Sequence, residues 1–166
     1  MSYGKKPWCL AVKDHNNAGK GSALTVWPCQ DNDASQLFQY VVKDDEQELG
    51  QIKYYNPVTK SHLCLDLKGG DDATTGSPIV LNSCKDVFED DNQAFFYQED
   101  YNLFTIPMDP KGDDDNLEDL CMGTKRTYDE KLEEGKFELV GVNCGGDSFV
   151  QGDVLFTMYP KYELAY

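Results

Sequence analysis

Six cysteines at regular spacing restrict the fold more than any other feature of this sequence. They form three successive pairs whose members are 20, 20 and 23 residues apart, and the first cysteines of the pairs lie 55 and 57 residues apart. A period near 55 residues predicts three copies of one structural unit, each with its own cysteine pair. The pairs are Cys9 with Cys29, Cys64 with Cys84, and Cys121 with Cys144.

The segment before the second cysteine of each pair is repeated as well. Gly21 and Gly76 lie eight residues before their cysteines, and alternating apolar residues follow both glycines. Such alternation, bounded by Gly and Pro, is typical of a short β-strand. Gly135 lies nine residues before Cys144, so a β-bulge is expected to absorb the additional residue in copy three.

A Gln-x-aromatic segment follows the second cysteine in copies one and two. Its glutamines, Gln36 and Gln93, are expected to bond backbone groups of their own repeat. Since about 50 residues cannot cover both faces of a small sheet, the three units are expected to share one core around a pseudo-threefold axis. Each unit is expected to contribute one apolar residue to it, namely Phe38, Phe95 and Leu155.

These markers resemble the ricin B-chain type of β-trefoil lectin. Copy one carries Trp-Pro-Cys at 27–29 and Gln-Leu-Phe at 36–38, and copy two carries Cys-Leu-Asp at 64–66 and Asn-Gln-Ala-Phe at 92–95. The resemblance covers essentially the whole chain and weakens after Cys144. Phe takes the place of the Trp in the family's Gln-x-Trp element.

The resemblance implies an all-β fold, a β-trefoil with pseudo-threefold symmetry. Residues 1–166 are expected to form one domain, with repeats at roughly 1–54, 55–108 and 109–166. Two polar stretches depart from the family pattern and are interpreted as surface insertions. The stretch 109–119 is expected to be a turn or loop, and 128–135 a loop or one helical turn.

Lectins of this type hold a sugar with three side chains in each repeat. An Asp two residues after the first cysteine accepts from sugar hydroxyls, a ring two residues before the second cysteine stacks on the sugar, and an Asn before the Gln completes the hydrogen bonding. Copy two has Asp66 and Asn92, but Asn82 replaces the ring. With Gln93 they form the candidate carbohydrate site; alternatively, Asp66 caps a turn and Asn92 bonds the backbone.

The other two copies keep less of this trio. Copy one retains the ring, Trp27, which is also interpreted as a partly buried packing residue, but Ala11 and Ser35 replace the Asp and the Asn. Copy three retains none, with Gly123, Val142 and Gly152 in their places. Loss of a charge-assisted hydrogen bond costs about 1.5–3 kcal/mol, and a millimolar site provides only about 4 kcal/mol, so a copy without its Asp is expected to be silent.

The sequence therefore predicts a non-enzymatic, galactose-type lectin domain that binds carbohydrate weakly, mainly through repeat two. One alternative is a degenerate trefoil that acts as a structural or protein-interaction subunit of a larger assembly. Another is a targeting module of a larger toxin or glycosidase. His15 and His62 lie in no metal-ligand spacing with the cysteines, and no catalytic site, cofactor or metal is expected.

The charge limits the possible partners. Fifteen Lys and Arg stand against 30 Asp and Glu, and a net charge of −15 argues against nucleic acid, whose phosphates require basic side chains. Acidic clusters such as 113–115 lack EF-hand spacing and are interpreted as a solvated surface rather than a Ca²⁺ site. No apolar run is long enough to span a membrane.

The cysteines also bear on the compartment. Three disulfides would fit a secreted or otherwise oxidising setting, whereas in the cytosol the cysteines would be small buried residues. No apolar stretch follows the short basic N-terminus, so no secretory signal peptide is expected in this chain.

Overall fold

The computed structural model describes residues 8–14, 17–44, 49–86, 91–98, 103–108, 119–129 and 134–144. These residues form ten β-strands and three short 3-10 helices. The strands are β1 (Trp8–Val12), β2 (Leu24–Pro28), β3 (Phe38–Asp44), β4 (Leu49–Asn56), β5 (Ser61–Leu67), β6 (Ile79–Asn82), β7 (Phe95–Gln98), β8 (Leu103–Ile106), β9 (Leu120–Asp129) and β10 (Glu134–Asn143). The 3-10 helices are η1 (Ala34–Gln36), η2 (Gly70–Asp72) and η3 (Asp91–Gln93). The predicted all-β fold is confirmed.

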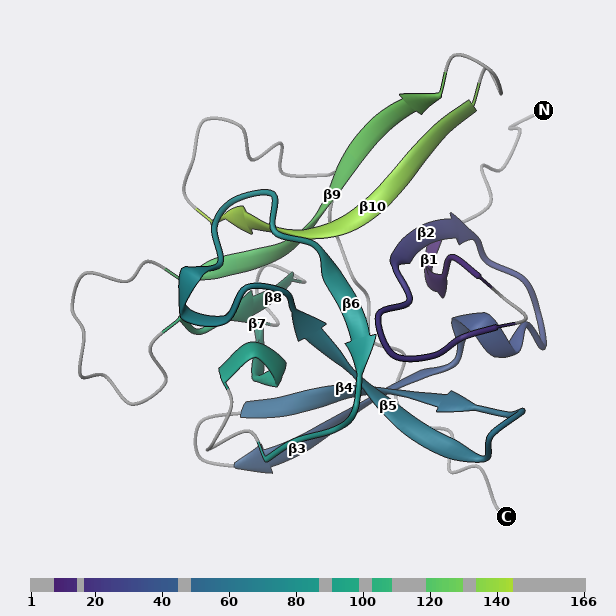
Figure 1. Cartoon of the computed structure of the whole chain (residues 1–166), viewed down its shortest axis with the longest axis horizontal. Helices are drawn as coiled ribbons and strands as arrows, with labels where there is room; N and C mark the ends of the chain where they lie inside the picture. Colours follow the sequence, from purple (N-terminus) through teal and green to yellow (C-terminus); the bar gives the residue numbers. More distant parts are fainter. Residues whose placement is uncertain are drawn as a thin grey trace.

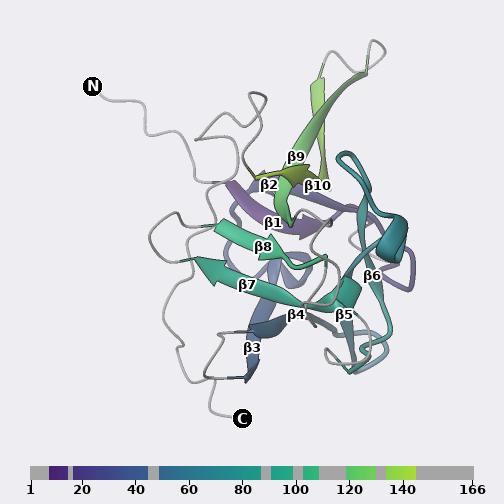
Figure 2. The same ribbon diagram turned by 90° about the vertical axis from the view of Figure 1, so that its left-hand side faces the viewer.

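Eight of the strands form one antiparallel sheet in the order β10-β9-β8-β7-β4-β5-β6, with β3 paired to β4. Strands β1 and β2 form a separate two-stranded ribbon. The β9–β10 hairpin is longer than the others and projects from the rest of the molecule as an arm (Figures 1 and 2).

Three hairpins, β1–β2, β5–β6 and β9–β10, have the same register relative to their cysteines. In each one, the first cysteine is paired with the residue two positions before the second cysteine. These pairs are Cys9 with Trp27, Cys64 with Asn82, and Cys121 with Val142. The disulfides Cys9–Cys29, Cys64–Cys84 and Cys121–Cys144 close within these hairpins, so the predicted pairing within each repeat is confirmed.

The repeats are also linked to one another by hydrogen bonds in matching places. Gly21 N donates to the carbonyl of Leu81 at 2.7 Å, and Gly76 N donates to the carbonyl of Gly141 at 2.8 Å. Gly21 and Gly76 have positive φ angles of 83° and 96°, a conformation that favours glycine. The glycines that precede the second cysteine thus turn the chain so that one repeat bonds the next.

Two residues after each of these glycines, the chain contacts the following repeat again. Ala23 forms a β-bridge with Val80 of repeat two, and Pro78 forms one with Val140 of repeat three. The third contact returns to repeat one, where the Thr25 hydroxyl donates to the carbonyl of Phe137. The three contacts therefore close a ring, which is the pseudo-threefold arrangement that the repeats predict.

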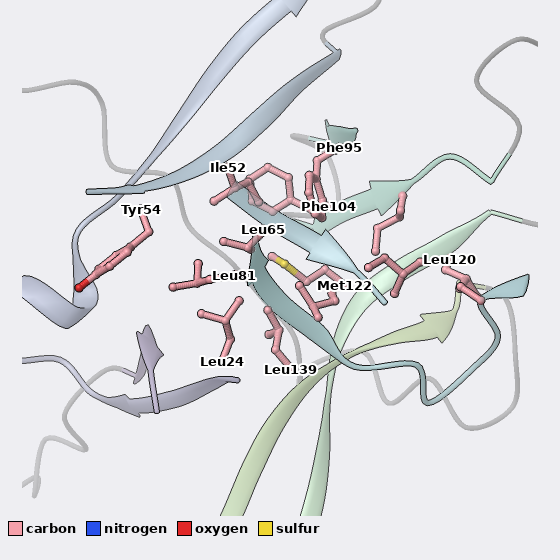
Figure 3. Packing of buried hydrophobic residues seen from close by; sticks show 14 of the residues in the cluster. Leu24, Ile52, Tyr54, Leu65, Leu81, Phe95, Phe104, Leu120, Met122 and Leu139 are labelled. Carbon is pink, nitrogen blue, oxygen red and sulfur yellow. The ribbon is translucent and has the colours of Figure 1, made fainter. Parts of the chain in front are cut away.

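The core lies inside this ring and is built from all three repeats (Figure 3). Leu24, Leu65, Leu81, Met122 and Leu139 are almost fully buried there. Of the predicted core residues, Phe95 is completely buried, whereas Phe38 is partly buried and packs on Tyr54 with a centroid distance of 5.5 Å. Leu155 lies outside the described residues.

One expectation for repeat three is wrong, and another holds for fewer residues than predicted. The β9–β10 ladder is continuous from Glu134–Asp129 to Asn143–Leu120, so no bulge absorbs the additional residue. The ends of the 128–135 stretch belong to these two strands, whereas residues 130–133, and residues 109–118 of the other predicted insertion, lie outside the described residues. The additional residues lengthen the hairpin because adding paired residues keeps the ladder hydrogen bonds intact, which a bulge would not.

Candidate functional site

A glutamine in repeat one fixes the backbone on both sides of a cysteine. Gln36 Nε2 donates to the carbonyl of Pro28 at 3.1 Å, and its Oε1 accepts from the N–H of Gln30 at 2.9 Å. Pro28 and Gln30 flank Cys29, the second cysteine of the repeat. The predicted backbone-bonding role of this glutamine is confirmed.

Gln93 repeats the arrangement in repeat two. Its Nε2 donates to the carbonyl of Ser83 at 2.8 Å, and its Oε1 accepts from the N–H of Lys85 at 2.9 Å. Ser83 and Lys85 flank Cys84, as Pro28 and Gln30 flank Cys29. Gln93 is completely buried, so its amide must find all its partners inside the protein.

In repeat two the glutamine also holds a carboxylate. Gln93 Nε2 donates to Asp66 Oδ2 at 2.8 Å, and Asn82 Nδ2 donates to the same oxygen at 3.2 Å. Asn82 Oδ1 in turn accepts from the N–H of Ser83 at 2.9 Å. The structure therefore brings together three of the predicted site residues, Asp66, Asn82 and Gln93.

The other oxygen of this carboxylate has no hydrogen-bond donor among the residues that the structure describes. Asp66 Oδ1 accepts no hydrogen bond from the described residues, and 6% of the surface of Asp66 remains exposed. The side chain is thus fixed through Oδ2 while Oδ1 can accept from a hydroxyl. Among the described residues, both hydrogen bonds that Asp66 accepts come from side chains and not from the backbone of a turn.

Asn92, the fourth predicted site residue in repeat two, precedes Gln93 in η3 and lies against the loop that contains η2. A Cβ atom placed on Gly70 would lie 3.4 Å from Asn92 Nδ2, so the backbone of η2 lies against this amide. Gly70 has a positive φ of 61°, and a side chain there would both strain the backbone and press on Asn92. The loop that joins β5 and β6 therefore forms one wall beside Asn92.

Sequence reasoning missed Gln51, which belongs to β4. Its Nε2 donates to the carbonyl of Lys85 at 2.7 Å and to Gln93 Oε1 at 3.4 Å. Only 1% of its surface is exposed. The signal that could have found it is a glutamine within an apolar strand, because a buried polar side chain requires partners.

Repeat one lacks the carboxylate at the position of Asp66. Ala11 occupies that position and is completely buried, and Ser35 is nearly so. Trp27 is 43% exposed and lies opposite Cys9, as Asn82 lies opposite Cys64. Because Trp27 and Asn82 occupy the same position in different repeats, the predicted ring is not part of the group around Asp66.

The corresponding position of repeat three is filled by an apolar side chain. Gly123 is buried, and a Cβ atom placed on it would lie 2.7 Å from Cγ2 of Val142. There is no room for a carboxylate here without movement of Val142. Gly152, the third position of this repeat, lies outside the described residues.

Among the described residues, no group of three His, Cys, Asp or Glu side chains is arranged to hold a metal ion. The 113–115 cluster lies outside them. The helices in the described part of the chain are all too short or too polar to cross a membrane.

Three β-hairpins, each closed by its own disulfide, form a ring, and repeat two carries the hydrogen-bonded group of Asp66, Asn82 and Gln93. These features define a β-trefoil of the lectin type. The model of the family described as the ricin-type beta-trefoil lectin domain matches residues 3–131. The chain belongs to this family. No curated protein and no solved structure matches it significantly.

Proposed function

We propose that this chain is a non-enzymatic domain that binds galactose-type carbohydrate weakly through repeat two. The observation that carries the proposal is the Asp66 carboxylate, which is held through Oδ2 by Gln93 and Asn82 while Oδ1 accepts no hydrogen bond from the described residues. A fixed carboxylate oxygen accepts a sugar hydroxyl without a cost for ordering the side chain. Asn92, which precedes Gln93 in η3 and whose amide faces Gly70, is the further polar group that we expect to contact the sugar.

The affinity is expected to be low. Asn82 stands where the family has an aromatic ring, and the stacking energy of a ring on the apolar face of the sugar is absent. Repeats one and three lack the carboxylate, so they do not add to the binding of a multivalent ligand. We expect a dissociation constant on the order of millimolar.

The test compares Asp66→Asn with the unmodified chain in a calorimetric titration with galactose and in retention on a galactose column. The substitution keeps the size of the side chain and removes its charge, so binding should fall below detection. Asp31→Asn is the matched control, since it removes one charge from an exposed turn in repeat one. Equal binding by the Asp66 variant and the unmodified chain would contradict the assigned site.

The alternative function is a degenerate trefoil that serves as a subunit of a larger assembly. The filled position beside Val142 and the alanine at position 11 favour it, because two of three repeats have no sugar site of this kind. This alternative predicts a stable stoichiometric partner in size-exclusion chromatography. It also predicts that neither the unmodified chain nor the Asp66→Asn variant binds galactose.

We further propose that residues 1–166 form one domain that resides in an oxidising compartment. The ring of contacts between repeats supports the single domain. The three disulfides are consistent with a secreted or other oxidising setting.

A further inference from the structure

The repeat-two site contains a side chain from another repeat. Gln51 belongs to β4, within the stretch assigned to repeat one, and reaches the loop that follows Cys84. Its Nε2 donates to the carbonyl of Lys85 at 2.7 Å and to Gln93 Oε1 at 3.4 Å. Gln51 and Gln93 are 42 positions apart in the sequence, and both are buried.

The amide of Gln93 uses its full hydrogen-bonding capacity. A primary amide has two N–H donors and two acceptor positions on its oxygen. The donors of Gln93 go to Ser83 O and Asp66 Oδ2. Its oxygen accepts from Lys85 N and from Gln51 Nε2.

This arrangement allows only one orientation of the Gln93 amide. If the amide rotated by half a turn, its oxygen would face the two acceptors and its NH₂ group would face the two donors. A buried donor that faces another donor, or an acceptor that faces another acceptor, loses its hydrogen bond, and inside the protein water does not replace that bond. The donor from Gln51 is one of the two groups that specify the orientation on the oxygen side.

We propose that Gln51 is a positioning residue of the repeat-two site, because its side-chain donor fixes the Gln93 amide in the orientation that presents an N–H to Asp66. The inference rests on the proposed function. Repeat two therefore depends on a strand of repeat one for its binding geometry. Without Gln51, one acceptor position of Gln93 and the carbonyl of Lys85 lose their buried donor, and the Asp66 carboxylate is less firmly held.

Repeat one provides a matched control. Gln36 makes the same two backbone contacts as Gln93, to the residues on either side of its cysteine. Ala11 stands where Asp66 stands in repeat two, so Gln36 holds no carboxylate there. A substitution of Gln36 thus removes two hydrogen bonds between a glutamine side chain and the backbone, where Gln51 makes one, without affecting the proposed site.

The experiment measures galactose affinity by calorimetry and the Gln93 side-chain NH₂ signals by ¹H–¹⁵N NMR, using the full chain. Gln51→Met removes the hydrogen bonds to Lys85 and Gln93, and the one to Gln93 is expected to count for the site. Its loss should weaken galactose binding about 3- to 10-fold and should shift and broaden the Gln93 NH₂ signals. Gln36→Met is expected to leave both unchanged. Gln51→Leu replaces Gln51→Met if that variant is not fully folded by circular dichroism.

The outcomes separate the inference from the proposed function. If Asp66→Asn abolishes binding but both Gln51 variants bind as the unmodified chain does, the positioning role is wrong and the site stands. If Asp66→Asn has no effect, the proposed site is wrong, and the NMR signals still decide the hydrogen-bond role. Unchanged Gln93 signals in the Gln51 variants overturn that role whatever the sugar affinity.

Discussion

A Cβ atom on Gly123 would lie 2.7 Å from Cγ2 of Val142, at the repeat-three position that Asp66 occupies in repeat two. The side chain of Val142 covers Gly123 and occupies the space that a side chain at position 123 would need. This relationship explains in packing terms why repeat three has no carboxylate of this kind. Repeats two and three therefore differ in the side chains at this position, although their hairpins have the same register.

Restoring the acid in repeat three should therefore not restore a site. Gly123→Asp is expected to lower the free energy of unfolding by about 1–3 kcal/mol, because the new side chain overlaps Val142. Gly123→Ala adds only a Cβ atom, so it should lower the free energy of unfolding by a smaller amount than Gly123→Asp. Urea unfolding of both variants checks the order, and galactose titration should show no gain. A stable Gly123→Asp variant with increased galactose binding would contradict the filled position.

An aromatic ring at position 82 should bind the sugar more tightly than an alanine at the same position. Asn82→Trp places a ring opposite Cys64, the position that Trp27 holds opposite Cys9. Both Asn82→Trp and Asn82→Ala remove the hydrogen bond to Asp66, so the comparison between them isolates the ring. The Trp variant is expected to bind galactose about 2- to 10-fold more tightly than the Ala variant by calorimetry. Equal affinities would show that the sugar does not lie over this position.

The Cys64–Cys84 disulfide should matter for binding beyond its effect on stability. Ser83 and Lys85, which hold Gln93, flank Cys84, and Cys64 lies two residues before Asp66. The double variant Cys64→Ala/Cys84→Ala is expected to lose about 3 kcal/mol of stability and its galactose binding. The double variant Cys9→Ala/Cys29→Ala opens a loop of the same 20-residue separation and should lose similar stability with binding retained. Urea unfolding and galactose titration of the two variants make the comparison.

Stability should decline at alkaline pH through Tyr54. Burial raises the pKa of Tyr54 above its ordinary value of 10.0, and the negative charge of Asp33 raises it further. The folded state therefore favours the neutral phenol, and this contribution is complete below pH 10 and is lost as the pH rises through the folded-state pKa. The unfolding free energy of the unmodified chain should fall more steeply above pH 10 than that of Tyr54→Phe.

The comparison with Tyr54→Phe removes the contributions of other groups. Burial lowers the pKa of Lys53, and the charge of Lys43 lowers it further. The folded state therefore favours the neutral amine, so the contribution of Lys53 to stability rises with pH, opposite to that of Tyr54. Lys53 is present in both proteins, so its effect cancels in the difference. Parallel pH profiles of the two proteins would show that Tyr54 does not carry the alkaline loss.

Local patterns in the sequence were sufficient for the repeated parts of the fold. The cysteine spacing predicted all three disulfides, and the Gln-x-aromatic segments predicted the backbone-bonding glutamines and the burial of Phe95. These features recur at a fixed period, so each copy supports the interpretation of the others. Asp66, Asn82 and Gln93 were singled out instead by their resemblance to the family's motifs, and the structure joins them by hydrogen bonds.

Features that lack a repeat could not be predicted. The role of Gln51 depends on a contact across 42 positions, which no local pattern encodes. The length of the β9–β10 hairpin was also open, because additional residues can enter a bulge, a loop or a ladder with the same sequence count. Pairing between the two strands decides among these, and it is set by tertiary contacts.

The ring of contacts from repeat to repeat has a consequence for folding. In an open array, an end repeat can detach while every other junction is preserved, but here each repeat shares one junction with each of the other two. Loss of any single hairpin thus breaks two of three junctions and opens the common interior to water. The three units are accordingly expected to melt together, as one cooperative transition.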